Sequence, residues 1–113
     1  MEEKTVVVKV KDVAQSPLKL RLVADVVRGK NASDALDRLM LLQKKGNNTI
    51  RKAILSGVAN AREQYGVDKE DLIISKIEIG EGRTLRRTRF ASRGRVSILN
   101  KRRSNIILEL KVK

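Results

Sequence analysis

The stretch IISKIEIGEGRTLRRTRFASRGRVSILNKRRSNIILELKV, residues 73–112, is the part of the chain that most strongly indicates its fold. Apolar and polar side chains alternate at both of its ends, with the period of two that is typical of half-buried antiparallel strands. The residues that share one face in this pattern are Ile73, Ser75, Ile77 and Ile79 at the first end, and Ile106, Leu108, Leu110 and Val112 at the second. The stretch therefore predicts two strands joined by a long intervening segment.

That intervening segment concentrates the positive charge of the chain. Of the 113 residues, 26 are Lys or Arg and 13 are Asp or Glu, which gives a formal net charge of +13. Between residues 82 and 108, nine residues are basic and none is acidic. The nine are Arg83, Arg86, Arg87, Arg89, Arg93, Arg95, Lys101, Arg102 and Arg103. The other 86 residues hold 17 basic and 13 acidic side chains, so they contribute only +4.

Such a segment favours a polyanion as its partner. Like charges at this density repel one another unless they are neutralised, and the planar guanidinium group binds a phosphate through two hydrogen bonds. A solvated basic loop does not need this concentration of charge. Binding to a membrane surface would need a basic amphipathic helix with a strong apolar face, which the segment lacks. Nucleic acid is therefore the expected partner.

The composition of the segment predicts an extended arm. It contains spaced apolar residues and no Pro, so both strands can continue into it as one long β-hairpin that turns near residues 90–94. With roughly 12 residues per strand at about 3.3 Å each, this hairpin would extend about 40 Å beyond the sheet. Tyr65 and Phe90 are the only aromatic residues, so the base-stacking surfaces of RRM and OB modules are missing. We expect residues 82–105 to form a basic arm that contacts the phosphates of a folded RNA.

The rest of the chain predicts one strand, residues 5–11, followed by three helices. The helices are expected over about residues 17–28, 34–45 and 49–65, each ending before a glycine. Their predicted N-caps are Ser16, which precedes Pro17, then Ser33, and then Asn48 or Thr49. This order indicates an α+β fold, in which a three-helix layer packs on a small antiparallel sheet of three strands and a long extended β-hairpin projects from it. We expect residues 1–113 to form a single domain.

The apolar residues of these elements recur at the spacing of one buried face. The expected inner faces are Val6, Val8 and Val10 in the strand, Leu20, Val23, Ala24 and Val27 in the first helix, Leu36, Leu39, Met40 and Gln43 in the second, and Ile50, Ala53, Ile54, Gly57, Val58 and Ala61 in the third. Gly57 costs about 1 kcal/mol relative to Ala in a helix interior, so close packing is its expected compensation. On the outer side of the first helix, Arg21 is expected to pair with Asp25.

The composition also excludes several classes of site. The chain has no Cys and no His, which removes disulfides, zinc fingers, thiolate nucleophiles and the commonest general base. No apolar run approaches the 18 or so residues of a membrane span, and the first residues do not lead into a signal-peptide core. We therefore expect a cytoplasmic protein with no metal, no cofactor and no membrane partner.

Other classes of protein have weaker support in the sequence. A transient nucleic-acid binder, such as an RNA chaperone or an architectural DNA-binding factor, would have a similar composition. A helix-turn-helix over residues 16–45 would leave the basic arm unexplained. An enzyme would need a carboxylate or metal centre, and the candidates resemble surface charges that flank a strand. Those candidates are Asp68, Glu70, Asp71, Glu78 and Glu81. We therefore expect a binding protein and not an enzyme.

The residues SPLKLRLVADVVRGK, residues 16–30, resemble the first-helix signature of the L22 family of large ribosomal subunit proteins. The resemblance continues in the family's order and spacing over residues 14–112. The matching steps are Ala35-Leu36, Ala59-Asn60-Ala61, Glu81-Gly82, Leu85-Arg86-Arg87, Arg93-Gly94-Arg95 and Lys101-Arg102-Arg103-Ser104. No single motif is decisive, but their colinearity over most of the chain is highly specific.

This resemblance implies a structural protein of the large ribosomal subunit, present in one copy and not as a homo-oligomer. The arm would bind large-subunit (23S-type) rRNA through its nine basic residues and support subunit assembly, with Lys19, Arg21 and Arg28 adding contacts from the first helix. Its tip would line the nascent polypeptide exit tunnel. The tip residues are Arg89, Phe90, Ala91, Ser92 and Arg93. The implied partners are rRNA, neighbouring ribosomal proteins and the nascent polypeptide.

The arm departs from the usual pattern of the family in three places. Arg83 stands where many members have Pro, and Phe90-Ala91-Ser92 stands where they have a Pro-Arg-Ala run. Asn105 occupies a position where His is common, between Ser104 and Ile106. These departures leave the implied rRNA-binding role unchanged.

Overall fold

The computed structural model describes residues 4–42, 46–82, 85–90 and 96–113, and for residues 85–90 and 96–101 it describes the backbone. The elements are β1 (Thr5–Val13), α1 (Pro17–Val27), α2 (Ala32–Leu41), α3 (Asn47–Tyr65), the 3-10 helix η1 (Lys69–Asp71), β2 (Leu72–Glu81), β3 (Leu85–Phe90), β4 (Val96–Lys101) and β5 (Ser104–Val112). The strand, the three helices and the following strands confirm the predicted α+β fold.

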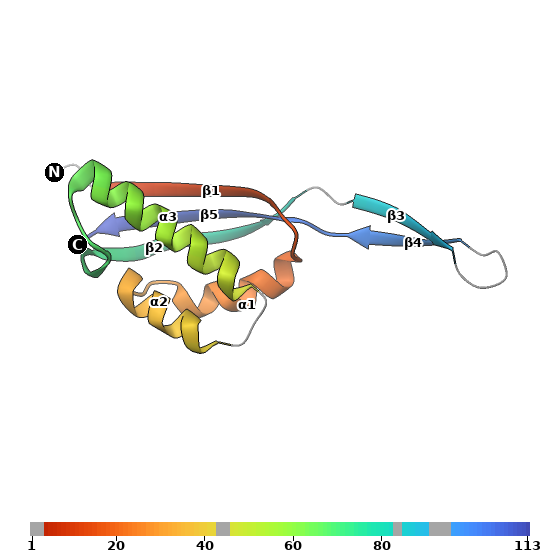
Figure 1. Cartoon of the computed structure of the whole chain (residues 1–113), viewed down its shortest axis with the longest axis horizontal. Coiled ribbons are helices and arrows are strands. Elements are labelled where there is room, and N and C mark those ends of the chain that lie inside the picture. The colour runs from red at the N-terminus through yellow and green to blue at the C-terminus, as the bar shows by residue number, and fades with distance from the viewer. Residues whose placement is uncertain (1–3, 43–45, 83–84, 91–95) are drawn as a thin grey trace.

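Three strands form one antiparallel sheet in the order β1-β5-β2, so the last strand of the chain lies at the centre. Thr5 pairs with Lys111 at one end of the sheet, and Val13 pairs with Ser104 at the other. The strands β3 and β4 form a separate two-stranded antiparallel sheet. In Figure 1 the three helices lie together on one side of the three-stranded sheet, and β3 and β4 lie beyond its end.

The core lies between the helices and the inner face of the three-stranded sheet. The predicted inner faces of α1 and α3 are buried throughout, as are Val6 and Val8 of β1. From β5 the sheet contributes Ile106, Leu108 and Leu110. The strict alternation predicted for the C-terminal strand is therefore confirmed over these residues.

Close packing at Gly57 explains the glycine in the middle of α3. A Cβ atom at this position would lie 2.5 Å from Cδ1 of Leu110 and 3.1 Å from Cγ2 of Val8. Real Cβ atoms do not approach other atoms as closely as the first of these distances. The absence of a side chain therefore lets α3 lie directly on β5 and β1, as the sequence predicts.

The inner face of β2 differs from the prediction in its first half. The buried residues are Leu72, Ile74, Ile77 and Ile79, whereas the predicted face begins with Ile73 and Ser75. The register with β5 shifts between Ile74 and Lys76, so that Ser75 is an extra residue in β2. A bulge of this kind changes which side chains face the core, and a strict period of two does not reveal it.

The prediction for α2 is wrong at its start and on part of its face. The N-cap is Asn31, whose side-chain oxygen accepts a hydrogen bond from the N–H of Ser33 at 2.9 Å. Met40 is 71% exposed, so it does not face the core. The buried residues of α2 are Ala32, Ala35, Leu36 and Leu39. Gln43, which was also predicted on the inner face, lies outside the described residues.

The start of α3 also differs from the prediction. The helix begins at Asn47, and neither Asn48 nor Thr49 caps it. The side-chain amide of Asn47 donates hydrogen bonds to the backbone carbonyls of Leu39 and Leu42. This amide therefore joins the end of α2 to the start of α3, which is a contact between two helices and not a local cap.

Candidate nucleic-acid interface

The basic arm, residues 82–105, contains the strand pair that lies beyond the core. β3 pairs with β4 in a regular antiparallel register, from Leu85 opposite Lys101 to Phe90 opposite Val96. The principal dimensions of the molecule are 65 × 28 × 19 Å, and Figure 1 shows β3 and β4 at one end of the longest. Two paired strands therefore lie within the basic segment, as predicted, while residues 91–94 of the predicted turn lie outside the described residues.

Charge is distributed unevenly along this long dimension. Positions 86, 87 and 89 of β3 and 101 of β4 are basic, and neither strand has an acidic residue. At the opposite end of the sheet both signs occur, since η1 carries Lys69 beside Glu70 and Asp71, and Lys113 bonds to Asp71 through its backbone. The end of the molecule that carries β3 and β4 is therefore the end that favours a polyanion.

The structure places the predicted RNA-contacting and tunnel-tip residues in four groups. Arg83, Ala91, Ser92, Arg93 and Arg95 lie outside the described residues. Arg86, Arg87, Arg89, Phe90 and Lys101 are placed by the backbone on β3 and β4. Lys19, Arg21 and Arg28 belong to α1 or follow it, and Arg102 and Arg103 lie at the base of the arm. The arm and α1 are thus separate candidate contact regions.

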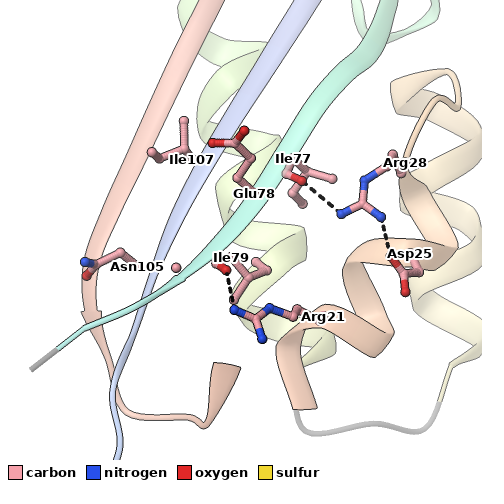
Figure 2. A pocket seen from close by; sticks show the side chains of 9 residues that line it. Arg21, Asp25, Arg28, Ile77, Glu78, Ile79, Asn105 and Ile107 are labelled. Atoms are coloured by element: carbon pink, nitrogen blue, oxygen red, sulfur yellow. Dashed lines mark hydrogen bonds and ion pairs between the residues drawn. The ribbon is translucent and has the colours of Figure 1, made fainter. Parts of the chain in front are cut away.

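Arg21 and Arg28 contact the edge of β2 from the adjacent helix (Figure 2). Nη2 of Arg21 donates to the backbone carbonyl of Ile79 at 3.2 Å, and Nη2 of Arg28 donates to that of Ile77 at 3.0 Å. Arg28 also forms an ion pair with Asp25, and this pair takes the place of the predicted pair between Arg21 and Asp25. Because β2 is an edge strand, these carbonyls have no neighbouring strand to donate to them.

The two arginines therefore have a structural role that the sequence analysis missed. Seven residues separate them, and residues two helical turns apart lie on the same side of a helix. This spacing is the signal that could have indicated a shared contact. Each guanidinium has five N–H donors, so both side chains retain further donors for a phosphate. Lys19 is exposed on the same helix.

A pocket of about 560 Å³ lies beside these arginines, between α1 and the sheet. It is lined by Arg21, Asp25, Arg28, Ile77, Glu78, Ile79, Gly80, Asn105 and Ile107. The carboxylates of Asp25 and Glu78 offset the charge of the two guanidinium groups. The pocket therefore lacks the excess of positive charge that the arm has, and the arm is the better supported nucleic-acid interface.

At the base of the arm, Arg102 and Arg103 have different surroundings. Arg102 is exposed, whereas Arg103 is half-buried. Nη1 of Arg103 donates to the backbone carbonyl of Asp12 at 3.1 Å. Arg102 therefore remains a candidate phosphate contact, while part of the Arg103 guanidinium is engaged within the fold. Asp12 has no signal in the sequence for this contact, because its part in the contact comes from its backbone.

The part of the chain that the structure describes provides little support for other kinds of site. It contains no group of three or more His, Cys, Asp or Glu side chains placed to hold a metal ion. None of its helices is both long enough and apolar enough to cross a membrane. Among the carboxylates considered for an enzymatic centre, Asp68 pairs with Arg62 at 2.9 Å and Glu78 with Lys76 at 3.3 Å. These are ordinary surface ion pairs.

Comparison with known proteins agrees with the resemblance found in the sequence. The family model described as ribosomal protein L22p/L17e matches residues 8–111. Curated relatives named large ribosomal subunit protein uL22, from Staphylococcus aureus strains JH9 and Newman, are 40% identical over 93 residues. The matched region covers 82% of this chain and 80% of each relative. Because the family model and the relatives both span most of its length, the chain belongs to the ribosomal protein L22p/L17e family.

Proposed function

We propose that the protein is a structural component of the large ribosomal subunit that binds 23S-type rRNA through its basic arm and supports subunit assembly. The observation that carries this proposal is an antiparallel strand pair outside the core, in a segment with nine basic residues and no acidic one. The relatives bear the name of a large ribosomal subunit protein. Its partners in that assembly would be rRNA and neighbouring ribosomal proteins, with one copy of the chain per subunit.

Family membership also indicates whether the protein is an enzyme. The matched family is one of ribosomal proteins, so the expectation that the chain is not an enzyme is confirmed. A component of the large subunit is located in the cytoplasmic ribosome, in agreement with the localisation expected from the sequence.

The arm is suited to contact with the phosphates of a folded RNA. A two-stranded ribbon exposes side chains on two faces along its whole length, so it can contact RNA segments on both sides. Phosphate contacts fix the position of a protein without reading the base sequence. Recognition would therefore depend on the shape of the folded rRNA, and binding would release counterions and weaken with salt.

The proposal includes a role for the tip of the arm, residues 89–93, in lining the nascent polypeptide exit tunnel. Its support is the family resemblance, together with the position of the end of β3 and the start of β4 far from the core (Figure 1). A photo-reactive side chain at Ser92 is expected to cross-link to a stalled nascent chain. The same side chain at Lys52, which is exposed on α3, is expected not to do so. Equal cross-linking at both positions would argue against the tunnel assignment.

A charge substitution tests rRNA binding. Replacing Arg86, Arg87 and Arg89 together with Gln is expected to lower the affinity for large-subunit rRNA. The slope of log K against log salt should fall by about 2–3, because each lost phosphate contact contributes about 0.7–0.9. Fluorescence anisotropy titrations over a range of salt concentrations measure both quantities, and circular dichroism should show unchanged helix content.

The matched control removes the same charge from exposed positions outside the arm. Replacing Lys9, Lys11 and Lys52 with Gln is expected to change the slope much less, since these residues lie on β1 and α3. An equal fall in both variants would mean that net charge, and not the arm, governs binding. A transient RNA binder is distinguished by washing large subunits in high salt, which would release it, whereas a structural component stays in stoichiometric amount.

A further inference from the structure

We propose that a cluster of hydrogen bonds at the base of the arm sets the direction in which the arm leaves the sheet. This root cluster consists of Asp12, Gly82, Arg103 and Asn105. Its side-chain members, Arg103 and Asn105, are positioning residues for the arm. The inference rests on the proposed function only where it treats the arm as the RNA contact.

The cluster lies where the three-stranded sheet passes into the two-stranded one. In the sheet, Glu81 pairs with Ser104, and in the arm the strand pairing resumes at Leu85 and Lys101. Between these pairs, the N–H of Gly82 donates to the carbonyl of Arg103 at 2.8 Å. A two-stranded ribbon is only marginally stable by itself, so a junction that is two strands wide gives the arm little resistance to bending.

The end of β1 supplies a third strand at this junction. The backbone N–H of Asp12 donates to Oδ1 of Asn105 at 3.2 Å, and its carbonyl accepts from Nη1 of Arg103 at 3.1 Å. Both backbone polar groups of Asp12 therefore bond to side chains at the base of the arm. The φ angle of Asp12 is 58°, in the left-handed region that L-residues rarely adopt. The register between β1 and β5 shifts here, so this conformation directs Asp12 toward the arm.

Close approach at Gly82 makes the cluster compact. A Cβ atom there would lie 3.2 Å from the carbonyl carbon and oxygen of Arg103 and 3.3 Å from Oδ1 of Asn105. A side chain at this position would press on the Asn105 oxygen that accepts from the Asp12 N–H and on the Arg103 carbonyl that accepts from Gly82. The glycine thus allows the strand that leads into the arm to contact both positioning residues.

A second contact holds the start of β5 from the helical side. Ser104 is fully buried, and its hydroxyl donates to the backbone carbonyl of Gln15 at 2.6 Å. Gln15 lies in the connection between β1 and α1. The residue that follows Arg103 is therefore anchored below the sheet, while Arg103 and Asn105 bond to the end of β1. The base of the arm is held from two directions.

The length of the arm amplifies any change at this base. Phe90 lies five residues beyond Leu85 in β3, which corresponds to about 17 Å of extended strand. A rotation of about 10° at the base would displace Phe90 by at least about 3 Å, the length of a hydrogen bond. Contacts that hold the base therefore decide whether the basic residues of β3 and β4 reach their phosphates together.

Replacing Asn105 tests this role, and its Ala variant does so without changing charge. Asn105→Ala removes the acceptor for the Asp12 N–H, whereas Asn105→Asp retains a side-chain oxygen there. Spin labels at Ser56→Cys on α3 and Ser97→Cys on β4 would report the angle of the arm, and the chain contains no other Cys. Pulsed electron paramagnetic resonance on the free full-length protein measures the distribution of the distance between the labels.

We expect the distance distribution of the Ala variant to be about twofold wider than that of the wild-type chain, because a two-stranded junction bends easily. The Asp variant should be as narrow as the wild type, and circular dichroism should show equal helix content in all three. An unchanged distribution in the Ala variant would overturn the inference. A distribution as wide in the Asp variant as in the Ala variant would overturn it as well.

RNA binding separates this inference from the proposed function. The Ala variant is expected to bind large-subunit rRNA about tenfold more weakly, since a less ordered arm loses more freedom on binding. Its salt slope should be unchanged, because no charge has been removed. A wider distribution with unchanged affinity would leave the role of the root cluster intact and would contradict the arm as the RNA contact.

Discussion

At the scale of single residues, the packing of α3 on the sheet depends on Gly57. Two effects with opposite signs determine how a side chain at this position would change the stability of the protein. Helix propensity favours Ala over Gly by about 1 kcal/mol. Against this, an added Cβ would contact Leu110 of β5 and Val8 of β1, which are themselves packed in the core. Interiors are close-packed, so these neighbours have little space into which they can move.

We predict that Gly57→Ala lowers the free energy of unfolding by about 1–2 kcal/mol, because the cost of overpacking exceeds the gain in helix propensity. Urea denaturation followed by circular dichroism measures the difference. Ser56→Ala is the matched control, since Ser56 is the exposed neighbour on the same helix. That control should raise stability by a few tenths of a kcal/mol. A Gly57→Ala variant more stable than the wild type would show that propensity dominates.

Periodicity identified Gly57 because a helical face repeats along the sequence whatever it packs against. It did not identify the exposure of Met40, whose apolar side chain fits a helical stripe although the structure leaves it 71% exposed. It also missed Ser75, since the bulge depends on how β2 pairs with β5. The left-handed φ of Asp12 could not be predicted from the sequence either, because it belongs to the junction with the arm. The features that periodicity does not predict depend on how elements distant in the sequence pack together.

At the scale of elements, the contact of α1 with the edge of β2 is the feature with the clearest consequence. Edge strands expose unpaired backbone groups that can pair with another chain. Here the side chains of Arg21 and Arg28 donate to two carbonyls of that edge. The turn after α1 covers more of it, since the N–H of Gly29 donates to Ile74 at 3.0 Å. The helix therefore protects the edge as well as packing on the sheet.

Replacing Arg21 and Arg28 together with Ala is expected to lower the free energy of unfolding by about 1 kcal/mol for each hydrogen bond lost. The freed edge is also expected to promote self-association as protein concentration rises. Thermal unfolding measures the first effect and sedimentation velocity the second.

The control for this prediction removes the same number of charges from exposed positions. Lys19→Ala with Lys52→Ala leaves the edge contacts in place. If this pair destabilises the chain as much as the arginine pair does, charge and not edge protection is responsible.

The helix boundaries show where local signals suffice. Ser16 caps α1 as predicted, because its side chain bonds to Lys19 within the same turn. The sequence predicts Ser33 as the N-cap of α2, whereas Asn31 is the N-cap in the structure. The side chain of Asn31 also donates to the carbonyl of Glu70 at 2.8 Å, and its backbone bridges to Ile73. Ser and Asn are both favourable N-cap residues, so the local sequence does not distinguish Ser33 from Asn31. The contacts of Asn31 with Glu70 and Ile73 favour Asn31.

At the scale of the whole molecule, the charge of the chain is divided between two parts. The arm has an excess of positive charge and no acidic residue, whereas the rest is nearly balanced. Among the residues whose burial the structure describes, the buried core comes from α1, α2, α3 and the three-stranded sheet. We propose that the chain is a single domain whose core does not depend on the arm.

Replacing residues 83–102 with an Asn-Gly turn, which favours a tight hairpin, tests this division. The shortened chain is expected to keep its helix content and to unfold cooperatively. It loses eight basic residues, so its salt slope for rRNA binding should fall by up to about 7. Calorimetry and anisotropy titrations measure the two properties. Loss of cooperative unfolding would show that the arm contributes to the core.

The central position of β5 constrains how the chain can fold during its own synthesis. β1 and β2 each pair only with β5 in the three-stranded sheet, and β5 is the last strand of the chain. Pairs such as Thr5 with Lys111 close loops of almost the full chain length, and contacts so distant in sequence slow folding. A growing chain can therefore form its helices early, but it cannot complete the sheet until β5 has emerged. Until then β1 and β2 lack their partner, and a truncation within β5 would remove the sheet rather than shorten it.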